Sequence, residues 1–134
     1  MKLSDLFGIA GSALGAQATR IRTITENLAN ADTAYGKDDL PYRRRTTIFQ
    51  SSLDRADGLE KVSVREIAED DSEAQLRYEP NHPLADAKGY VRYPDINSIL
   101  EMADLREAER SYKANMQIVE SAKRLLRTTL DVIR

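Results

Sequence analysis

Apolar side chains recur every seven residues near both ends of the chain, and this spacing restricts the possible folds more than any other feature. Near the N-terminus there are two such rows, offset from each other by three or four residues. The first row is Phe7, Leu14, Ile21 and Leu28, and the second is Leu3, Ala10, Gln17, Ile24 and Ala31. Two rows at this offset form the buried strip of a coiled-coil helix. We therefore predict a helix from about Leu3 to Ala31, roughly 45 Å long at 1.5 Å per residue.

The C-terminal third carries the same pattern with larger side chains. One row is Leu105, Tyr112, Val119, Leu126 and Ile133, and Met102, Met116 and Leu130 lie beside it. Pro94 precedes this segment, so that Asp95 or Asn97 is the expected N-cap of a second helix. A further row, Ile118, Leu125 and Val132, makes the apolar face wider than one partner helix can cover. We therefore expect this helix to need partners beyond its own chain.

Three glycines lie inside the first predicted helix, at positions 8, 11 and 15. Each glycine in a helix interior costs roughly 1 kcal/mol relative to alanine. Small residues such as Gly11, Gly15 and Ala18 also let a neighbouring backbone approach closely. We hypothesise that this segment is a marginal helix by itself and becomes ordered when it packs among other helices.

The middle of the chain contains short runs typical of strands, at residues 46–49, 62–64 and 76–78. About 60 residues are close to the lower limit for a self-sufficient core, so we expect a small β-rich unit that rests on the helices. The predicted fold is thus mainly α, with paired long N- and C-terminal helices that assemble into a tube. Residues 1–33 and 96–134 would form one discontinuous helical domain, and residues 34–95 a small β-rich outer domain.

Composition excludes several classes of function. The formal net charge is −2, from 20 basic and 22 acidic residues, so nothing indicates a general attraction to nucleic acid or to anionic membranes. The one basic run, Arg43–Arg45, is expected to be solvated or to lie at an interface. The chain has no cysteine, and therefore no disulfide and no thiolate nucleophile.

The uncharged run at residues 6–19 is too short and too polar to cross a bilayer, which takes about 20 mostly apolar residues. A signal peptide is the alternative, because Lys2 precedes the run and residues 13–15 resemble a cleavage site. Asp5 and the seven-residue pattern, which continues through the supposed cut, favour a segment that is retained.

No catalytic, cofactor-binding or metal-binding residues are predicted. His82 is the single histidine and lies between two prolines, which favours a rigid surface turn. The acidic residues Glu69, Asp70, Asp71 and Glu73 do not match the spacing of a calcium loop, and a solvated loop is the simpler interpretation. An enzyme is therefore the least favoured class.

Three stretches taken together carry a resemblance to a known family. They are residues 9–14 (IAGSAL) followed by 27–33 (NLANADT), residues 82–86 (HPLAD) followed by 89–91 (GYV), and residues 110–115 (RSYKAN). Their combination closely resembles the FlgC family of bacterial flagellar basal-body proximal-rod proteins, over nearly the whole chain. The first stretch alone resembles flagellar rod and hook proteins in general, and the second points to this family among them. The departures, at residues 37–39 and 43–45, affect only expected contacts with specific partners.

The resemblance implies a structural subunit of a hollow rod in the periplasm that transmits torque and catalyses no reaction. In the family, terminal helices pair and pack with those of neighbouring subunits, and the middle domain faces outward. The implied partners are copies of the chain, other proximal-rod and distal-rod proteins, the MS-ring adaptor and the flagellar type III export apparatus. The resemblance also implies export without a cleaved signal peptide.

Two sets of residues follow. The expected assembly interface comprises Phe7, Gly11, Leu14, Gly15, Ile21, Leu28, Leu105, Tyr112, Val119, Leu126 and Ile133. The family motif comprises Asn27, Leu28, Ala29, Asn30, Asp32, Thr33, His82, Pro83, Asp86, Gly89 and Tyr90. We expect the two helices to be antiparallel, with the first row buried near Val119, Leu126 and Ile133. Asn27 and Asn30 have two interpretations, as residues that end the helix or as amides that link subunits.

The sequence is also consistent with two alternatives. One is another flagellar axial subunit or adaptor, which would share the same physical properties and have different neighbours. The other is a soluble helical adaptor that acts as a discrete dimer.

Overall fold

The computed structural model describes residues 2–133 and shows two long antiparallel helices with β-structure beside and beyond them. Helix α1 spans Leu3–Asn30 and helix α2 spans Ser98–Ile133. Between them lie β1 (Arg45–Asp54), β2 (Leu59–Glu69), β3 (Gln75–Tyr78) and β4 (Tyr90–Tyr93). The predicted fold class, mainly α with a small β-rich middle, is confirmed, and each of the three predicted strand runs lies within a strand.

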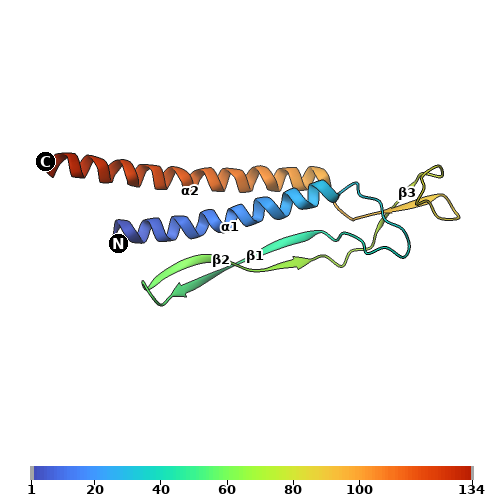
Figure 1. The fold of residues 1–134 in the computed structure, drawn as a ribbon, viewed down its shortest axis with the longest axis horizontal. Helices are drawn as coiled ribbons and strands as arrows, with labels where there is room; N and C mark the ends of the chain where they lie inside the picture. Colours follow the sequence, from blue (N-terminus) through green and yellow to red (C-terminus); the bar gives the residue numbers. More distant parts are fainter. Residues whose placement is uncertain (1, 134) are drawn as a thin grey trace.

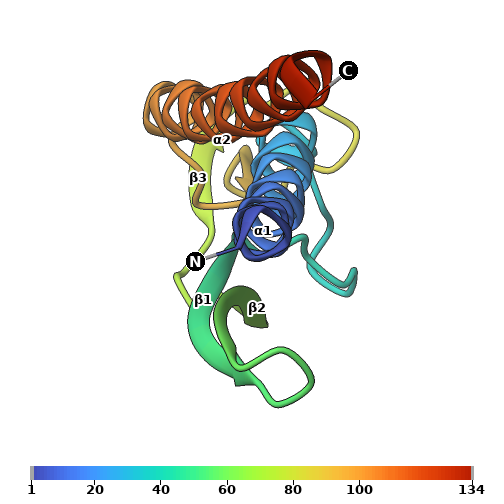
Figure 2. The same ribbon diagram turned by 90° about the vertical axis from the view of Figure 1, so that its left-hand side faces the viewer.

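The elements are stacked along one long axis. Figure 1 shows α1 between α2 on one side and the hairpin of β1 and β2 on the other, with β3 at the end remote from both chain termini. Figure 2, which looks along this axis, shows the same order of layers. Helix α1 is therefore the central element, and it contacts α2, β1 and β2.

The ends of the helices are defined by side chains close in sequence. At the start of α1 the backbone N–H of Lys2 donates to Asp5 Oδ2 at 2.7 Å. At its end, Asn30 Nδ2 donates to the carbonyl of Glu26 at 2.8 Å, which agrees with helix termination as the role of Asn30. At the start of α2, Asn97 Oδ1 accepts from the backbone N–H of Ile99 at 3.1 Å, so the N-cap is Asn97 and not Asp95.

Strands β1 and β2 form a long, twisted antiparallel hairpin, paired from Arg45 with Glu69 to Asp54 with Leu59. The two strands cross in projection, so that β2 lies nearer to α1 towards the tip (Figure 1). There the N–H of Val62 donates to Ser12 Oγ on α1 at 3.2 Å. A Cβ atom at Gly8 would lie 3.6 Å from Leu59 Cδ1, which marks a close approach of α1 to the hairpin.

Strands β3 and β4 form a separate two-stranded antiparallel sheet. One face of this sheet contributes Val91 and Tyr93 to the small buried core, and Ile96 follows them before α2. The opposite face carries Tyr78 and Tyr90, whose rings meet edge to face with centroids 5.4 Å apart. This end of the molecule therefore has its own packing, separate from the contact between the helices.

Candidate assembly interface

The contact between α1 and α2 is lined mainly by small side chains. On α2 the buried residues are Glu101, Ala108 and Ala122, which lie in one seven-residue row whose member between the two alanines, Asn115, is half-buried. On α1 the second predicted row supplies Ala10 and Ile24, which are buried, and Ala31 just beyond the helix is buried as well. Small side chains let two helix backbones approach closely, so this contact holds the helices together with little apolar bulk.

The larger side chains predicted for this contact lie at its margins. Phe7, Leu14, Ile21 and Leu28 on α1 are all half-buried, as are Leu105, Tyr112 and Val119 on α2. The antiparallel arrangement of the helices is confirmed. Full burial of the first row within the chain is not observed, because the second row faces α2 and the first row lies beside it.

The last part of α2 has no helix opposite it. Asn27 faces Glu101 and Arg20 faces Glu107, so in this register Leu3 lies opposite about residue 124. Beyond that point Leu126 is 43% exposed and Ile133 is 77% exposed. The prediction that these two residues are buried against α1 is therefore wrong for the single chain. Helix α1 starts at Leu3, and no part of it lies opposite them.

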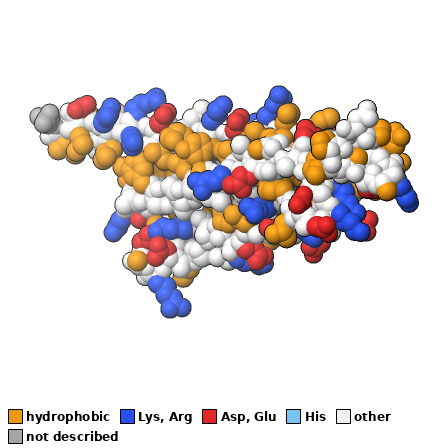
Figure 3. All heavy atoms as spheres, turned by 45° about the vertical axis from the view of Figure 1, so that its right-hand side comes forward, with side chains coloured by type: hydrophobic (Ala, Val, Ile, Leu, Met, Phe, Trp, Pro, Cys, Tyr) orange, Lys and Arg blue, Asp and Glu red, His pale blue; other side chains and the backbone are white. Residues whose placement is uncertain are grey.

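Several large apolar side chains are exposed together on this part of α2, which we call the free end of α2 (residues 123–133). They are Leu125, Leu126, Leu130, Val132 and Ile133. Figure 3 shows hydrophobic side chains along it, next to the grey atoms of the terminal residue. Ile118, which precedes the free end, is exposed as well. The whole row of Ile118, Leu125 and Val132 is thus exposed, as expected for a face too wide for one partner.

Close packing at Gly11 and Gly15 is not found within the chain. A Cβ atom at either position would meet nothing within 4 Å, and both residues are exposed. Of the three glycines in α1, only Gly8 has close neighbours, from β2. Close packing at Gly11 and Gly15 against helices of other subunits stays a prediction, because α2 and the hairpin of the same chain cover other sides of α1.

A buried polar cluster joins α1, α2 and the hairpin. Asn27 is fully buried, and its Nδ2 donates to the carbonyl of Arg45 at 2.8 Å and to Glu101 Oε2 at 3.2 Å. Its Oδ1 accepts from Tyr42 Oη at 2.8 Å and from the N–H of Arg45 at 2.9 Å. Arg44 Nε donates to Glu101 Oε1, and Glu101 is 1% exposed. Burial raises the pKa of Tyr42 above its usual value.

This cluster supports neither interpretation of Asn27, since α1 continues beyond it to Asn30 and its amide does not bond to the end of the helix. All its hydrogen-bonding capacity is used within the chain, so its amide is not available to link subunits. A buried polar group with every partner present specifies one arrangement of the elements around it. Asn27 therefore fixes the register of α1, α2 and the start of β1.

The three arginines that precede and begin β1 are each engaged within the chain. Arg43 Nη1 lies 2.8 Å from Asp71 Oδ1, and Arg45 forms ion pairs with Glu26 at 3.6 Å and Glu69 at 3.5 Å. Arg44 binds Glu101 as described above. Arg43 and Arg45 are partly exposed, as predicted for a solvated run. Arg44 instead lies between elements of the same chain, where it binds the buried Glu101.

The second part of the family motif forms a tight turn between β3 and β4. Asp86 Oδ1 accepts from the N–H of Lys88 at 2.8 Å and of Tyr90 at 2.9 Å, and these bonds lower the pKa of Asp86. Gly89 has φ of +86°, and a Cβ there would lie 2.9 Å from the ring of Tyr78. His82 Nδ1 accepts from the N–H of Leu84 at 3.1 Å, as expected for a histidine in a rigid turn. Asp86, Gly89 and His82 thus stabilise the conformation of the turn itself.

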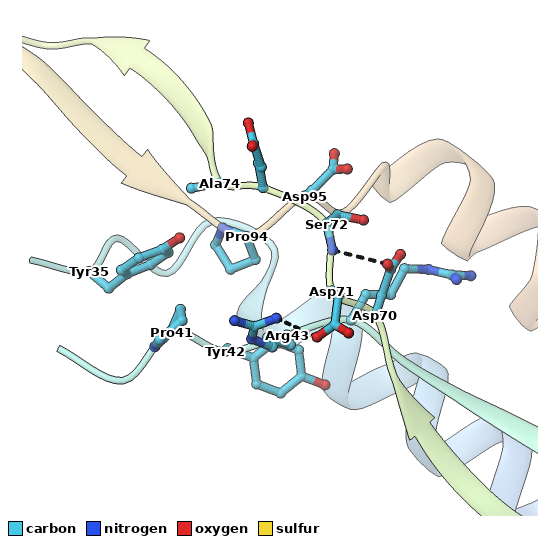
Figure 4. A pocket seen from close by; sticks show the side chains of 12 residues that line it. Tyr35, Pro41, Tyr42, Arg43, Asp70, Asp71, Ser72, Ala74, Pro94 and Asp95 are labelled. Atoms are coloured by element: carbon cyan, nitrogen blue, oxygen red, sulfur yellow. Dashed lines mark hydrogen bonds and ion pairs between the residues drawn. The ribbon is translucent and has the colours of Figure 1, made fainter. Parts of the chain in front are cut away.

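The acidic residues that follow β2 line a hollow of about 210 Å³, shown in Figure 4. Asp71 points to Arg43 across it, and Tyr35, Tyr42 and Pro94 form apolar walls. Ser72 donates to Asp70 through its backbone N–H at 3.1 Å, and its hydrogen bonds lower the pKa of that carboxyl. Within residues 2–133 no group of three or more His, Asp or Glu side chains is arranged to hold a metal ion.

Sequence reasoning missed Glu101, Ala108 and Ala122 as the residues that α2 buries most. They precede Leu105, Tyr112 and Leu126 by four residues, so they occupy the second row of the same seven-residue pattern. The available signal was the spacing, since alanine and glutamate do not stand out as apolar. The apolar residues expected beside the main row are Met102, Met116 and Leu130; Met116 is half-buried, whereas Met102 and Leu130 are more than half exposed.

Comparison with known proteins agrees with the motifs. The family model of flagella basal body rod proteins matches residues 7–34, and that of the C-terminal region of flagellar basal body rod FlgEFG proteins matches residues 87–132. The flagellar basal-body rod protein FlgC of Agrobacterium fabrum is 43% identical over 98% of this chain and 96% of its own length. The FlgC of Escherichia coli O6:H1 is 41% identical over 97% of each chain, and that of Borreliella burgdorferi is 34% identical over 100% of this chain and 99% of its own.

The two matched regions cover most of α1 and α2, the elements that form the candidate interface. Neither helix, as far as the structure describes it, contains an apolar stretch long enough to cross a membrane.

Proposed function

The chain belongs to the FlgC family of flagellar basal-body rod proteins, and on this premise we propose that it builds the proximal part of the rod through its terminal helices. It is a structural subunit of the basal-body rod. In our proposal it assembles with copies of itself and with other proximal-rod and distal-rod proteins. The MS-ring adaptor would be a further neighbour.

One observation carries this proposal above the others. The free end of α2 exposes five large apolar side chains on a regular helix, with Val132 81% exposed. An exposed apolar surface of this kind, next to a well-packed contact, marks a site of protein association. The proposed assembly interface comprises Phe7, Gly11, Leu14, Gly15, Ile21, Leu28, Leu105, Tyr112, Val119, Leu126 and Ile133.

In this proposal the helices of many copies form the wall of a hollow shaft that transmits torque, and the chain catalyses no reaction. The polar cluster around Asn27 supports a mechanical role, because it ties both helices to the hairpin through buried hydrogen bonds. A load on one element is then passed to the other two. Residues 34–95 would form the outer part of the subunit.

We also propose a periplasmic location reached through the flagellar type III export apparatus, without cleavage near residue 15. Ser12 supports retention of this segment, since it binds the backbone of β2. Cleavage there would remove nearly half of α1 together with its contacts to the hairpin.

The test is a charged substitution on the free end of α2. Leu126→Asp should block assembly into the rod and abolish motility, because a carboxylate would be buried among apolar side chains. The fold of the single chain should be nearly unaffected, since Leu126 is 43% exposed and lies beyond the start of α1 in the observed register. A matched control is Gln117→Asp, which is nine residues away and so on the opposite side of α2.

Normal motility and normal recovery of the Leu126→Asp variant with detergent-resistant basal bodies would contradict the proposal. A chain that stays in the soluble fraction as a discrete dimer would favour the adaptor alternative instead.

A further inference from the structure

The free end of α2 lacks a partner for a geometric reason. In the observed register α1 begins opposite about residue 124, so the side of α2 that faces α1 continues beyond the end of α1. Leu126, Leu130 and Ile133 lie on this continuation and are 43%, 56% and 77% exposed. The helix therefore carries the surface of a helix pair with no second helix present.

A second surface of the chain lacks a partner in the complementary way. The outer face of α1, by which we mean Gly11, Gly15 and Ala18, is exposed and turned away from α2 and the hairpin. At Gly11 and Gly15 even an added Cβ would have open space within 4 Å. Half-buried Phe7 and Leu14 border this face on the side of α2.

The two surfaces match in charge and in length. Residues 6–19 of α1 carry no charged side chain, between Asp5 and Arg20. On the free end of α2 the helical spacing turns Arg124, Arg127 and Asp131 away from the apolar side, and Lys123, seven residues before Leu130, lies at its edge. Both stretches span roughly 15–20 Å at 1.5 Å per residue.

They also match in shape. The free end of α2 has bulky, branched side chains, whereas the outer face of α1 is nearly flat because its side chains are absent or a single methyl group. Large side chains from one helix fit best where the opposing helix is small. The side of α1 that faces α2 is already occupied along its whole length, so it cannot receive a second helix.

We propose that the free end of α2 in one copy lies on the outer face of α1 in a second copy, across Gly11, Gly15 and Ala18. This inference rests on the proposed function and adds the specific surfaces. The contact is heterologous, because each copy offers one surface and receives on another. Repetition of such a contact yields a ring or an open helix and not a closed dimer.

The size of the contact makes single encounters weak. The free end exposes five large apolar side chains, a small surface for a contact between two proteins. A stable pair buries about 800 Å² on each partner. Each copy in a chain of copies makes the contact twice, so association should grow steeply with concentration.

Cysteine cross-linking tests the contact directly, because the chain has no cysteine of its own. One preparation carries Gly11→Cys, Gly15→Cys or Ala18→Cys, and a second carries Leu126→Cys or Leu130→Cys. Mixing the two under mild oxidation should give a reducible mixed dimer for at least one combination. Thr25→Cys is the control, since it is exposed on the same helix outside the uncharged stretch, and should give none.

A bulky substitution provides the second arm. Gly15→Leu should raise the concentration needed for half-maximal assembly at least tenfold while leaving the melting temperature of the single chain unchanged or higher. The side chain has open space in the chain, and leucine favours a helix more than glycine.

The outcomes distinguish failure of this particular contact from failure of the proposed function. If Leu126→Asp blocks assembly and Gly15→Leu does not, and no mixed dimer forms, the free end of α2 docks elsewhere and this contact is overturned while the proposed function stands. If neither substitution affects assembly, the proposed function itself fails.

Discussion

The two parts of α2 share one helix and one seven-residue pattern, and yet they have opposite surroundings. From Ser98 to Ala122 the helix packs along α1, with Glu101, Ala108 and Ala122 no more than 1% exposed. From residue 123 onward every described side chain is exposed. The packed part uses small and polar residues where it meets α1, and the free end carries larger ones. The seven-residue pattern thus indicates that a helix packs against a partner. The size of the residues in that pattern indicates how closely the two helix backbones approach.

The largest expected effect comes from breaking the packed part at Glu101. Glu101→Ala should lower the free energy of unfolding by about 3 kcal/mol, because Arg44 and Asn27 lose a buried partner. Urea denaturation followed by circular dichroism measures the change. Gln117→Ala, on the exposed side of the same helix, should change it by less than about 0.5 kcal/mol. Equal effects of the two would show that the buried cluster does not define the packed part.

Overfilling the packed part should have the next largest effect. Ala108→Leu inserts a large side chain where the helices are close and should cost about 2 kcal/mol of stability. Ala114→Leu is the matched change at an exposed position of α2 and should cost almost nothing. Thermal melts of both variants distinguish them. A melt unchanged by Ala108→Leu would mean that the helices are farther apart than described.

A substitution at Gly11 should have the opposite effect on stability. Gly11→Ala should stabilise the single chain by about 1 kcal/mol, because alanine favours the helix and nothing lies within 4 Å of the new methyl group. Gly89→Ala is the contrasting control and should destabilise, since Gly89 has φ of +86° and a close neighbour in Tyr78. Both values follow from denaturant titration. A loss of stability in Gly11→Ala would reveal an intrachain contact at that position.

The free end should hardly contribute to the stability of the single chain. Leu125→Ala is expected to change the free energy of unfolding by less than about 0.5 kcal/mol, because Leu125 is 65% exposed. The same variant should weaken assembly in sedimentation experiments. A destabilised monomer would indicate that the free end folds back onto its own chain.

The smallest effect is expected outside α2, in the turn around Asp86. Its pKa is lowered because backbone N–H groups, above all that of Tyr90, donate to the carboxylate. The carboxylate of Asp86 therefore stabilises the folded chain fully at pH values above 3.8, the ordinary pKa of an aspartate. This stabilisation is lost as the pH falls through the lower pKa that Asp86 has in the folded state. Stability of Asp86→Asn compared with the parent between pH 2 and 6 measures it; the difference should shrink only at the acid end. A difference that is constant over this range would remove the carboxylate charge as its cause.

The sequence predicted both long helices, the antiparallel pairing, the strand runs and the width of the apolar face of α2. These features depend on local spacing, which neighbours in sequence determine. The sequence did not identify Glu101, Ala108 and Ala122 as the buried positions, because burial of small or charged residues depends on what lies opposite them. It also gave two possible roles for Asn27, as a helix end or as a link between subunits, and the four hydrogen bonds of its amide to Arg45, Glu101 and Tyr42 support neither.

By itself, then, the sequence determined that two amphipathic helices exist and that the second has more apolar surface than one helix can cover. Only the tertiary structure decided which rows face each other, where α1 stops along α2, and that Gly11 and Gly15 have open space beside them. The physical reason is that periodicity is a property of one helix, whereas register and closeness are properties of a pair. The buried bonds of Asn27 and Glu101 set that register, and the uncovered end of α2 follows from it.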